Sequence, residues 1–255
     1  MDLSVVIPSY NERENLERGV LKEVSTYLNK QNYTWEVIVS EDGSPDLESR
    51  RLAKEFCDKN KNFVFLQNEH GGKAATVWAG IQKAKGNLIL FTDMDQSTPI
   101  TETEKLLPNF SQGYDVVIGS RGLARKNYSL IRQLASIVFR TFRGLFLLPE
   151  IIDTQAGFKA FTKKSITDVF PKLEVIRQKQ SSKGWTVGSW DAEMLFIAKK
   201  YGYKIKEVPI LWEDRDESRA KAQERKQGKF VKESLEMLKQ IFRVRFNELK
   251  GYYNK

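Results

Sequence analysis

The chain has 255 residues, 40% of them hydrophobic and 11% aromatic, which is enough for the core of one large α/β domain or two small ones. Its formal net charge is +9, so we expect an anionic partner such as nucleic acid, an anionic membrane face or a phosphorylated substrate. A single cysteine excludes an internal disulfide. A single histidine excludes a multi-histidine metal site and argues against a Ser-His-Asp triad.

The first half of the chain alternates strand-like and helix-like patterns. Short apolar runs predict strands at Leu3–Ile7, Trp35–Val39, Phe63–Leu66, Leu88–Phe91 and Asp115–Ile118. Helical spacing predicts helices at Glu12–Leu28, Pro45–Asp58, Ala74–Lys85 and Glu102–Phe110. Such alternation predicts a mainly parallel sheet that is covered on both faces by helices.

The second half adds longer amphipathic segments. We predict a two-faced helix at Leu130–Leu148, a turn into a strand at Ile151–Phe161, a helix at Trp185–Tyr201, a strand at Ile205–Ile210 and a basic helix at Lys229–Lys250. The first of these helices either packs on the core or lies in a membrane interface. The last, whose apolar face should include Phe242 and Leu249, either caps the domain or lies on an anionic bilayer.

Membrane-spanning and targeting patterns are not found. The N-terminus lacks the basic region and apolar run of a signal peptide. No uncharged stretch approaches the ~18–20 apolar residues of a membrane span. We therefore expect a cytoplasmic protein, or one attached to the cytoplasmic face of a membrane without crossing it.

Polar clusters follow four of the predicted strands. They are Pro8–Glu12, Ser40–Ser44, the pair Asp93 and Asp95, and Gly119–Arg121. Each cluster alone fits a cap or a turn. If the strands are parallel, however, all four meet at one edge of the sheet, where ligands of open α/β sheets bind.

The pair Asp93 and Asp95 suggests a metal site. Two neighbouring carboxylates repel each other unless a cation lies between them, and hard divalent ions prefer carboxylate oxygen. We therefore expect a metal that holds a phosphate-bearing substrate. His70-Gly71-Gly72-Lys73 opens a predicted helix and either receives phosphate or forms a tight turn.

Taken together, five segments resemble a known family. They are Val5–Glu12, Glu41–Ser44, Asp93-x-Asp95, Gly119–Arg121 and Asp153–Lys159, in this order. The set resembles the family 2 glycosyltransferases of the GT-A fold over about residues 3–245. Within that family it is similar to the polyprenyl-phosphate hexosyltransferases, first the dolichyl-phosphate glucosyltransferases and next the dolichol-phosphate mannose synthases.

The resemblance implies metal-dependent, inverting transfer of a hexose to a polyprenyl or dolichyl monophosphate. Glucose from UDP-glucose is the first expectation, and GDP-mannose as donor or a hydroxyl acceptor are the alternatives. The acceptor phosphate, with a second pKa of ~6, is already ionised and needs no strong base. Expected partners are the nucleotide sugar, the lipid phosphate and a membrane surface. Nucleic acid is not expected, because the basic residues are not interleaved with stacking aromatics in a recognisable module.

The resemblance also implies roles for individual residues. Nucleotide-sugar contacts are expected from Pro8, Tyr10, Glu12, Ser40, Asp42, Lys73, Thr92, Asp93, Met94, Asp95, Arg215 and Arg219. Mg²⁺ or Mn²⁺ would be bound by Asp93 and Asp95, with Ser97 at the position of a third ligand. Arg121, Arg132 and Ser136 would receive the acceptor phosphate. Catalytic roles are expected for Asp95, Arg121 and Asp191, the last as a group that orients the sugar.

The expected organisation is one catalytic domain followed by a helix. Residues 1–228 would form the GT-A domain, with the interface helix at 128–149 inside it. Residues 229–255 would form the C-terminal basic amphipathic helix.

Overall fold

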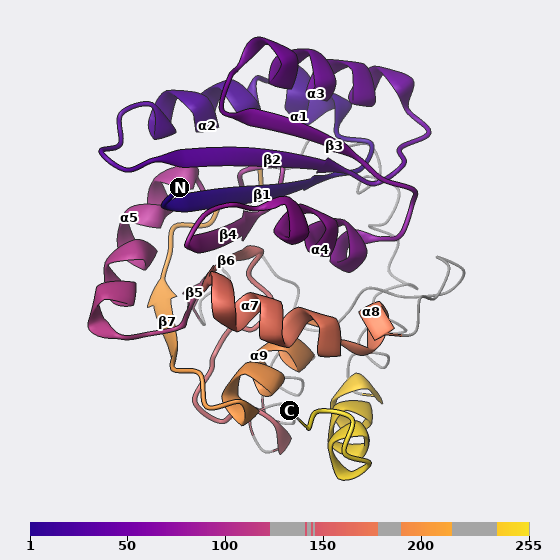
Figure 1. Cartoon of the computed structure of the whole chain (residues 1–255), viewed down its shortest axis with the longest axis vertical. Helices are drawn as coiled ribbons and strands as arrows, with labels where there is room; N and C mark the ends of the chain where they lie inside the picture. The colour runs from indigo at the N-terminus through magenta and orange to yellow at the C-terminus, as the bar shows by residue number, and fades with distance from the viewer. Residues whose placement is uncertain (123–140, 142–143, 145, 178–189, 216–238, 255) are drawn as a thin grey trace.

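The structure is a computed structural model that describes residues 1–122, 141, 144, 146–177, 190–215 and 239–254 (Figure 1). In these ranges seven strands form one sheet in the order β3-β2-β1-β4-β6-β5-β7. The strands are β1 (Leu3–Ser9), β2 (Trp35–Glu41), β3 (Phe63–Gln67), β4 (Leu88–Thr92), β5 (Val116–Ser120), β6 (Phe158–Thr162) and β7 (Ile205–Pro209). Only β6 runs antiparallel to its neighbours, so the prediction of a mainly parallel sheet is confirmed.

Helices cover both faces of this sheet (Figure 1). One face packs against α2 (Val20–Leu28), α3 (Leu47–Lys59) and α5 (Thr103–Leu106), and the other against α4 (Lys73–Lys83), α7 (Lys163–Val169) and α9 (Trp190–Lys200). Shorter elements are α1 (Arg13–Glu17), α8 (Glu174–Arg177) and the 3₁₀ turns Ile100–Glu102, Leu107–Gln112 and Phe170–Lys172. Alternation along β1 explains the two cores, because Val5 faces one layer and Val6 the other.

Two helices that we predicted as continuous are divided, so those predictions are wrong in extent. The segment Glu12–Leu28 breaks at Gly19, whose φ of 90° lies in the left-handed region that glycine adopts without steric penalty. The segment Glu102–Phe110 changes to a 3₁₀ turn after Leu106, and Pro108 near the start of that turn lacks the N–H that an α-helix interior needs.

The C-terminal segment is helical over residues 239–249 and packs on the core. Ile241, Val244 and the following Tyr253 are buried in the layer that contains α9. The described part of this helix therefore packs on the domain, as the capping alternative expected. Phe242 and Leu249, which we predicted on its apolar face, are 51% and 84% exposed and take no part in this packing. Most of the predicted helix Leu130–Leu148 lies outside the described residues.

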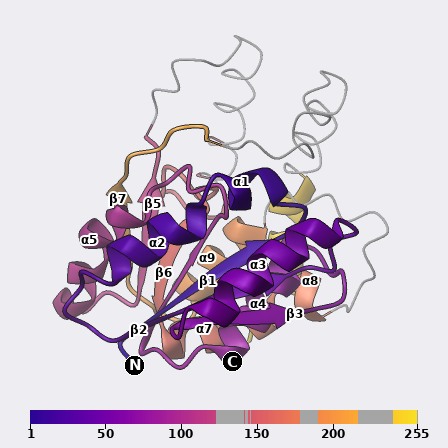
Figure 2. The same ribbon diagram turned by 90° about the horizontal axis from the view of Figure 1, so that it is seen from above.

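The edge where the parallel strands end positions the site. In Figure 2 the N-terminus lies at the edge where these strands begin, and the chain after β7 leaves from the opposite edge. Within the described ranges, no helix combines the length and the apolar character that crossing a membrane requires.

Candidate active site

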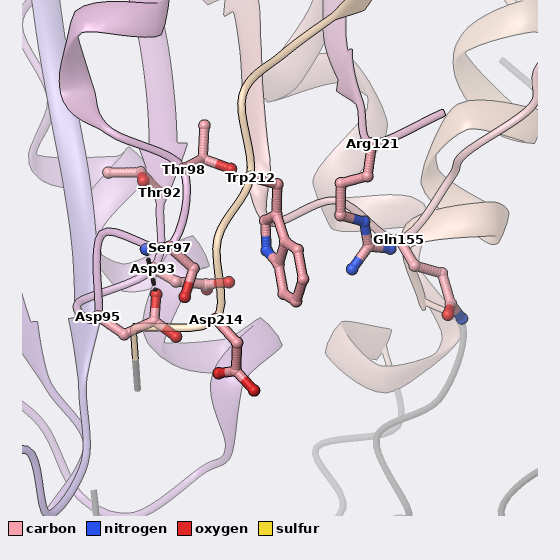
Figure 3. A pocket seen from close by; sticks show the side chains of 10 residues that line it. Thr92, Asp93, Asp95, Ser97, Thr98, Arg121, Gln155, Trp212 and Asp214 are labelled. Carbon is pink, nitrogen blue, oxygen red and sulfur yellow. Dashed lines mark hydrogen bonds between the residues drawn. The ribbon is translucent and has the colours of Figure 1, made fainter. Parts of the chain in front are cut away.

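The four polar clusters do meet at one edge of the sheet. The ends of β1 and β2 are joined there, because Asp42 N–H donates to the Ser9 carbonyl at 2.9 Å and Asn11 N–H to the Ser44 hydroxyl at 3.0 Å. A pocket of about 110 Å³ opens beside them, lined by Thr92, Asp93, Asp95, Ser97, Thr98, Arg121, Gln155, Gly157, Trp212 and Asp214 (Figure 3). Half of these residues belong to the expected site. Thr98, Gln155, Gly157, Trp212 and Asp214 were not expected.

The turn after β4 directs both aspartates into this pocket. Gln96 has a φ of 50° and donates its N–H to the Asp93 carbonyl at 3.3 Å, which closes the turn. Met94 between the aspartates is buried in the core, so the two carboxylates share the opposite side. The Met94 side chain therefore faces the core and not the pocket.

Lys73, the first residue of α4, forms an ion pair with Asp93. Burial by itself would lower the pKa of Lys73, but the nearby carboxylates of Asp93, Asp191 and Asp95 raise it above the ordinary lysine value. Gly157 faces the same aspartate, since a Cβ at this position would lie 2.0 Å from Asp93 Oδ2. A glycine at position 157 is thus needed for the carboxylate to occupy this place.

The pocket wall suits a hard divalent ion that binds together with a phosphate ligand. Among the described residues, no three Asp, Glu, His or Cys side chains converge into a metal-binding group. The wall nevertheless offers carboxylate oxygens from Asp93, Asp95 and Asp214. Mg²⁺ is commonly held by one or two carboxylates while substrate phosphates and water complete its shell. Asp93 and Asp95 therefore fit Mg²⁺ or Mn²⁺ bound with a diphosphate, and do not fit an all-protein metal cage.

Ser97 anchors the segment that follows β7. Its carbonyl accepts the Glu213 N–H at 2.8 Å, and its hydroxyl accepts the Arg215 N–H at 3.1 Å. These bonds hold Trp212 and Asp214 against the pocket. The Arg215 guanidinium, which we expected over the diphosphate, instead forms a bidentate pair with Glu23 at 3.1 and 3.2 Å. Arg219 lies outside the described residues.

Arg121 stands on the side of the pocket opposite the aspartates. In Figure 3 the Trp212 ring lies between the two sides, and Arg121 Cζ is 5.7 Å from its centroid. The Arg121 guanidinium donates two hydrogen bonds to the Asp153 carboxylate, at 2.7 and 2.9 Å. The Glu207 carboxylate in turn accepts the Asp153 N–H at 2.7 Å. A bidentate carboxylate fixes the plane of a guanidinium. Arg121 is therefore oriented before any ligand binds, while Arg132 and Ser136 lie outside the described residues.

Asp191 is held by Lys159, which the sequence analysis placed in the segment Asp153–Lys159 without assigning it a role. Asp191 lies in the first turn of α9, and Lys159 Nζ in β6 donates to its Oδ1 at 2.6 Å. The Lys159 side chain is fully buried, and its ammonium also donates to the Ala156 carbonyl. A lysine within the apolar strand Phe158–Thr162 was the available signal, because lysine is almost never fully buried unless it is paired.

The expected nucleobase contacts come together around His70. The Tyr10 and His70 rings stack with centroids 4.7 Å apart, and His70 Nδ1 lies 3.0 Å from Asp42 Oδ2. Asp42 also accepts the N–H groups of Gly71 at 2.8 Å and Gly72 at 3.1 Å. These bonds favour the tight-turn interpretation of the segment before α4 over a phosphate-binding one.

Three further expected nucleotide contacts are placed as follows. Ser40 is fully buried and donates its hydroxyl to the Thr76 carbonyl at 2.8 Å, so it stabilises the packing of α4 on β2. The Glu12 carboxylate accepts the Asn15 side-chain amide at 2.6 Å. Pro8 is partly exposed near the end of β1.

Comparison with known proteins agrees with this geometry. Residues 4–170 match the family model described as Glycosyl transferase family 2. The chain is 33% identical over 232 residues to a dolichyl-phosphate beta-glucosyltransferase of Trichomonas vaginalis, covering 86% of this chain and 68% of that protein. It is 29% identical over 272 residues to the dolichyl-phosphate beta-glucosyltransferase of Saccharomyces cerevisiae, covering 98% and 76% respectively.

A solved structure shares the fold. Glucosyl-3-phosphoglycerate synthase from Mycobacterium tuberculosis, in complex with Mn²⁺, UDP and phosphoglyceric acid, matches with a TM-score of 0.57 and 17% identity. The match covers 99% of this chain and 78% of that chain. Similarity at this level of identity concerns the arrangement of the strands and helices alone.

Proposed function

The chain belongs to glycosyltransferase family 2, and from this premise we propose that it transfers a hexose from a nucleoside diphosphate sugar to the phosphate of a polyprenyl monophosphate, with inversion. Glucose is the proposed sugar and dolichyl phosphate the proposed acceptor, as the names of the two relatives suggest, and UDP-glucose is the proposed donor. The observation that carries the proposal is one pocket with two carboxylates on one side and a pre-oriented arginine on the other.

Asp93 and Asp95 are proposed to act on the nucleotide-sugar donor. They would hold Mg²⁺ or Mn²⁺, which supplies neutralisation of the charge that develops on the departing nucleoside diphosphate. Lys73 next to Asp93 adds a cation at the same place. Tyr10 and Asp42 lie together where the base and ribose are proposed to bind. Each of these groups stabilises negative charge or orients the donor, and none needs to transfer a proton.

Arg121 is proposed to bind the phosphate of the acceptor. A guanidinium presents two parallel N–H groups that match a phosphate, and Asp153 already holds it in place. Arg132 and Ser136 are proposed to complete the phosphate site. Because a phosphate monoester with a second pKa of ~6 is ionised near neutral pH, it attacks the sugar without a general base. Asp191 is then proposed to orient sugar hydroxyls.

The exposed side of the C-terminal helix supports docking to a cytoplasmic membrane face. Phe242, Phe246 and Leu249 form an exposed stripe on the side of the helix away from the buried Ile241 and Val244. Exposed lysines and arginines border this stripe at Lys239, Arg243, Arg245 and Lys250. Phe146, at the end of the predicted interface helix, lies with its ring centroid 5.4 Å from that of Phe242. An apolar stripe between cations is typical of helices in an anionic membrane interface.

An acceptor panel tests the proposal. The purified chain is incubated with radiolabelled UDP-glucose or GDP-mannose, a short polyprenyl phosphate or a glycan alcohol, and Mn²⁺, Mg²⁺ or EDTA. We expect lipid-linked glucose from UDP-glucose with either metal and none with EDTA or with Asp95→Asn. Product on the alcohol alone, or unchanged activity of Asp95→Asn, would contradict the proposal. Mannose transfer from GDP-mannose would reassign the donor.

A further inference from the structure

A buried lysine–aspartate pair lies next to the pocket, because Lys159 donates to the Ala156 carbonyl and the two neighbours of Ala156, Gln155 and Gly157, line the pocket. Lys159 is fully buried, whereas the Asp191 side chain that it contacts is 18% exposed. The ammonium donates to Asp191 Oδ1 and to the Ala156 carbonyl, and it lies 5.4 Å from the centroid of the Phe91 ring. The carboxylate is therefore partly open to solvent while its counter-charge is enclosed by the protein.

A buried ion pair of this kind contributes little net free energy to the stability of a core. Desolvation of two charges offsets much of their mutual attraction, and apolar residues of similar volume often stabilise a buried position equally well. Phe91 and Phe161 show that the surrounding layer is built from large apolar side chains. A buried ion pair next to a proposed active site therefore calls for a role other than packing.

The charge distribution of the site indicates that role. The segment that Lys159 binds at Ala156 links the two sides of the pocket, since Gln155 lies on the Arg121 side and Gly157 faces Asp93 (Figure 3). An acceptor phosphate that approaches the sugar would be repelled by an uncompensated carboxylate at position 191. The ammonium of Lys159, in direct contact with that carboxylate, cancels most of its field at longer range.

We propose that Lys159 is a positioning residue that fixes and neutralises Asp191, so that the acceptor side of the site admits a negatively charged acceptor and not only a neutral alcohol. This inference rests on the proposed function. It assigns the preference for an anionic acceptor partly to Lys159, in addition to the arginine that contacts the phosphate.

Equilibrium binding of farnesyl phosphate and of farnesol separates charge from packing. Lys159→Met leaves the carboxylate of Asp191 without its counter-ion, and we expect the Kd for farnesyl phosphate to rise by roughly tenfold while the Kd for farnesol stays unchanged. Lys206→Met on β7 removes an exposed lysine, hence the same unit of charge, and should change neither Kd.

Two further variants keep the test decisive if Lys159→Met does not fold. Asp191→Asn is close to isosteric and partly exposed, so it should fold, and we expect tighter binding of farnesyl phosphate with unchanged binding of farnesol. In the double variant Lys159→Met/Asp191→Asn both charges leave together, and binding of farnesyl phosphate should return toward the wild-type value.

Three results would have different meanings. If Lys159→Met raises the Kd for both ligands equally, and the double variant shows no recovery, the inference is overturned and Lys159 is a structural residue. Weaker binding of farnesyl phosphate by Asp191→Asn would also overturn it. If the wild-type chain binds farnesyl phosphate no better than farnesol, the proposed function itself fails.

Discussion

Two lysine–aspartate pairs in the site differ in their access to solvent. In the pair between Lys73 and Asp93, at the proposed metal site, both side chains are more than one third exposed, at 36% and 38%. In the pair between Lys159 and Asp191, the lysine is fully enclosed. The partly exposed pair is accessible to solutes, so we expect its partners to change when a metal ion and a diphosphate bind, whereas we expect the buried pair to stay as it is. The two pairs should therefore respond differently to mutation and to ligand.

Breaking the buried pair should give the largest effect. Lys159→Met leaves Asp191 partly buried without its counter-ion, and removal of one partner of a buried pair destabilises proteins by about 3–5 kcal/mol. Urea unfolding followed by circular dichroism measures the loss. A change below about 1 kcal/mol would place this pair in the class of exposed pairs and remove the distinction between the two pairs.

Removing the exchangeable carboxylate should affect activity far more than stability. For Asp93→Asn we expect turnover with Mn²⁺ to fall by roughly 100- to 1000-fold, the range seen when one preorganised electrostatic contact is lost. Asp58→Asn is the matched control, because Asp58 forms an exposed pair with Lys54 on α3, where each side chain is 59% exposed. Comparable turnover in the two variants would show that Asp93 is not part of the donor site.

Glu193 is a buried carboxyl on the same helix as Asp191, and it accepts hydrogen bonds from a tyrosine hydroxyl and a backbone N–H. Glu193, two residues after Asp191 on α9, accepts the Tyr253 hydroxyl at 2.7 Å and the Glu174 N–H at 3.0 Å. Burial raises the pKa of Glu193 from 4.5 to about 7, although these hydrogen bonds oppose the shift. The folded state therefore retains a proton between about pH 4.5 and 7 that the unfolded chain has released.

The raised pKa of Glu193 makes the stability of the folded protein depend on pH. Stability should fall as the pH rises through this window, by up to about 3 kcal/mol, and then level off above pH 7. Glu193→Gln has no proton to lose, so its stability should be flat over the same window and exceed that of the wild type at pH 8. Chemical unfolding between pH 5 and 8 measures both curves. Parallel curves for the two proteins would rule out a role for Glu193.

The smallest expected effect is on the stability of the exposed pair. Lys73→Met should change the free energy of unfolding by less than about 1 kcal/mol, because partly exposed ion pairs contribute little. The same variant should weaken binding of the nucleotide sugar, since it removes the cation beside Asp93. Thermal unfolding with and without UDP-glucose and Mn²⁺ reports both quantities. A large loss of stability without ligand would mean that Lys73 is as structural as Lys159.

The comparison also explains which features the sequence could predict. Strands such as Leu88–Thr92 are short apolar runs between turn residues, so local pattern was sufficient to find them. The aspartates after β4 could be placed because parallel strands end at one edge. The break at Gly19 was missed because the apolar helical pattern continues on both sides of it, and a single glycine does not reveal its φ.

The long-range contacts of the site could not be predicted from the sequence. Lys159 and Asp191 are 32 positions apart and meet only after β6 enters the sheet antiparallel, between β4 and β5. Trp212 was part of a charged segment with no local signal, and it reaches the pocket because Ser97 binds the backbone of that segment. The C-terminal helix is apolar on two sides, and the sequence pattern alone does not show which of them packs on the domain and which, with Phe242 and Leu249, is exposed.

A crystal structure of the protein with UDP-glucose and Mn²⁺ tests the account most directly. We expect the ion to contact Asp93 and Asp95, Lys73 to turn from Asp93 toward the diphosphate, and the bond between Lys159 and Asp191 to remain as it is. An ion bound away from both aspartates, or a donor complex in which the buried pair has separated while the exposed pair is intact, would contradict it.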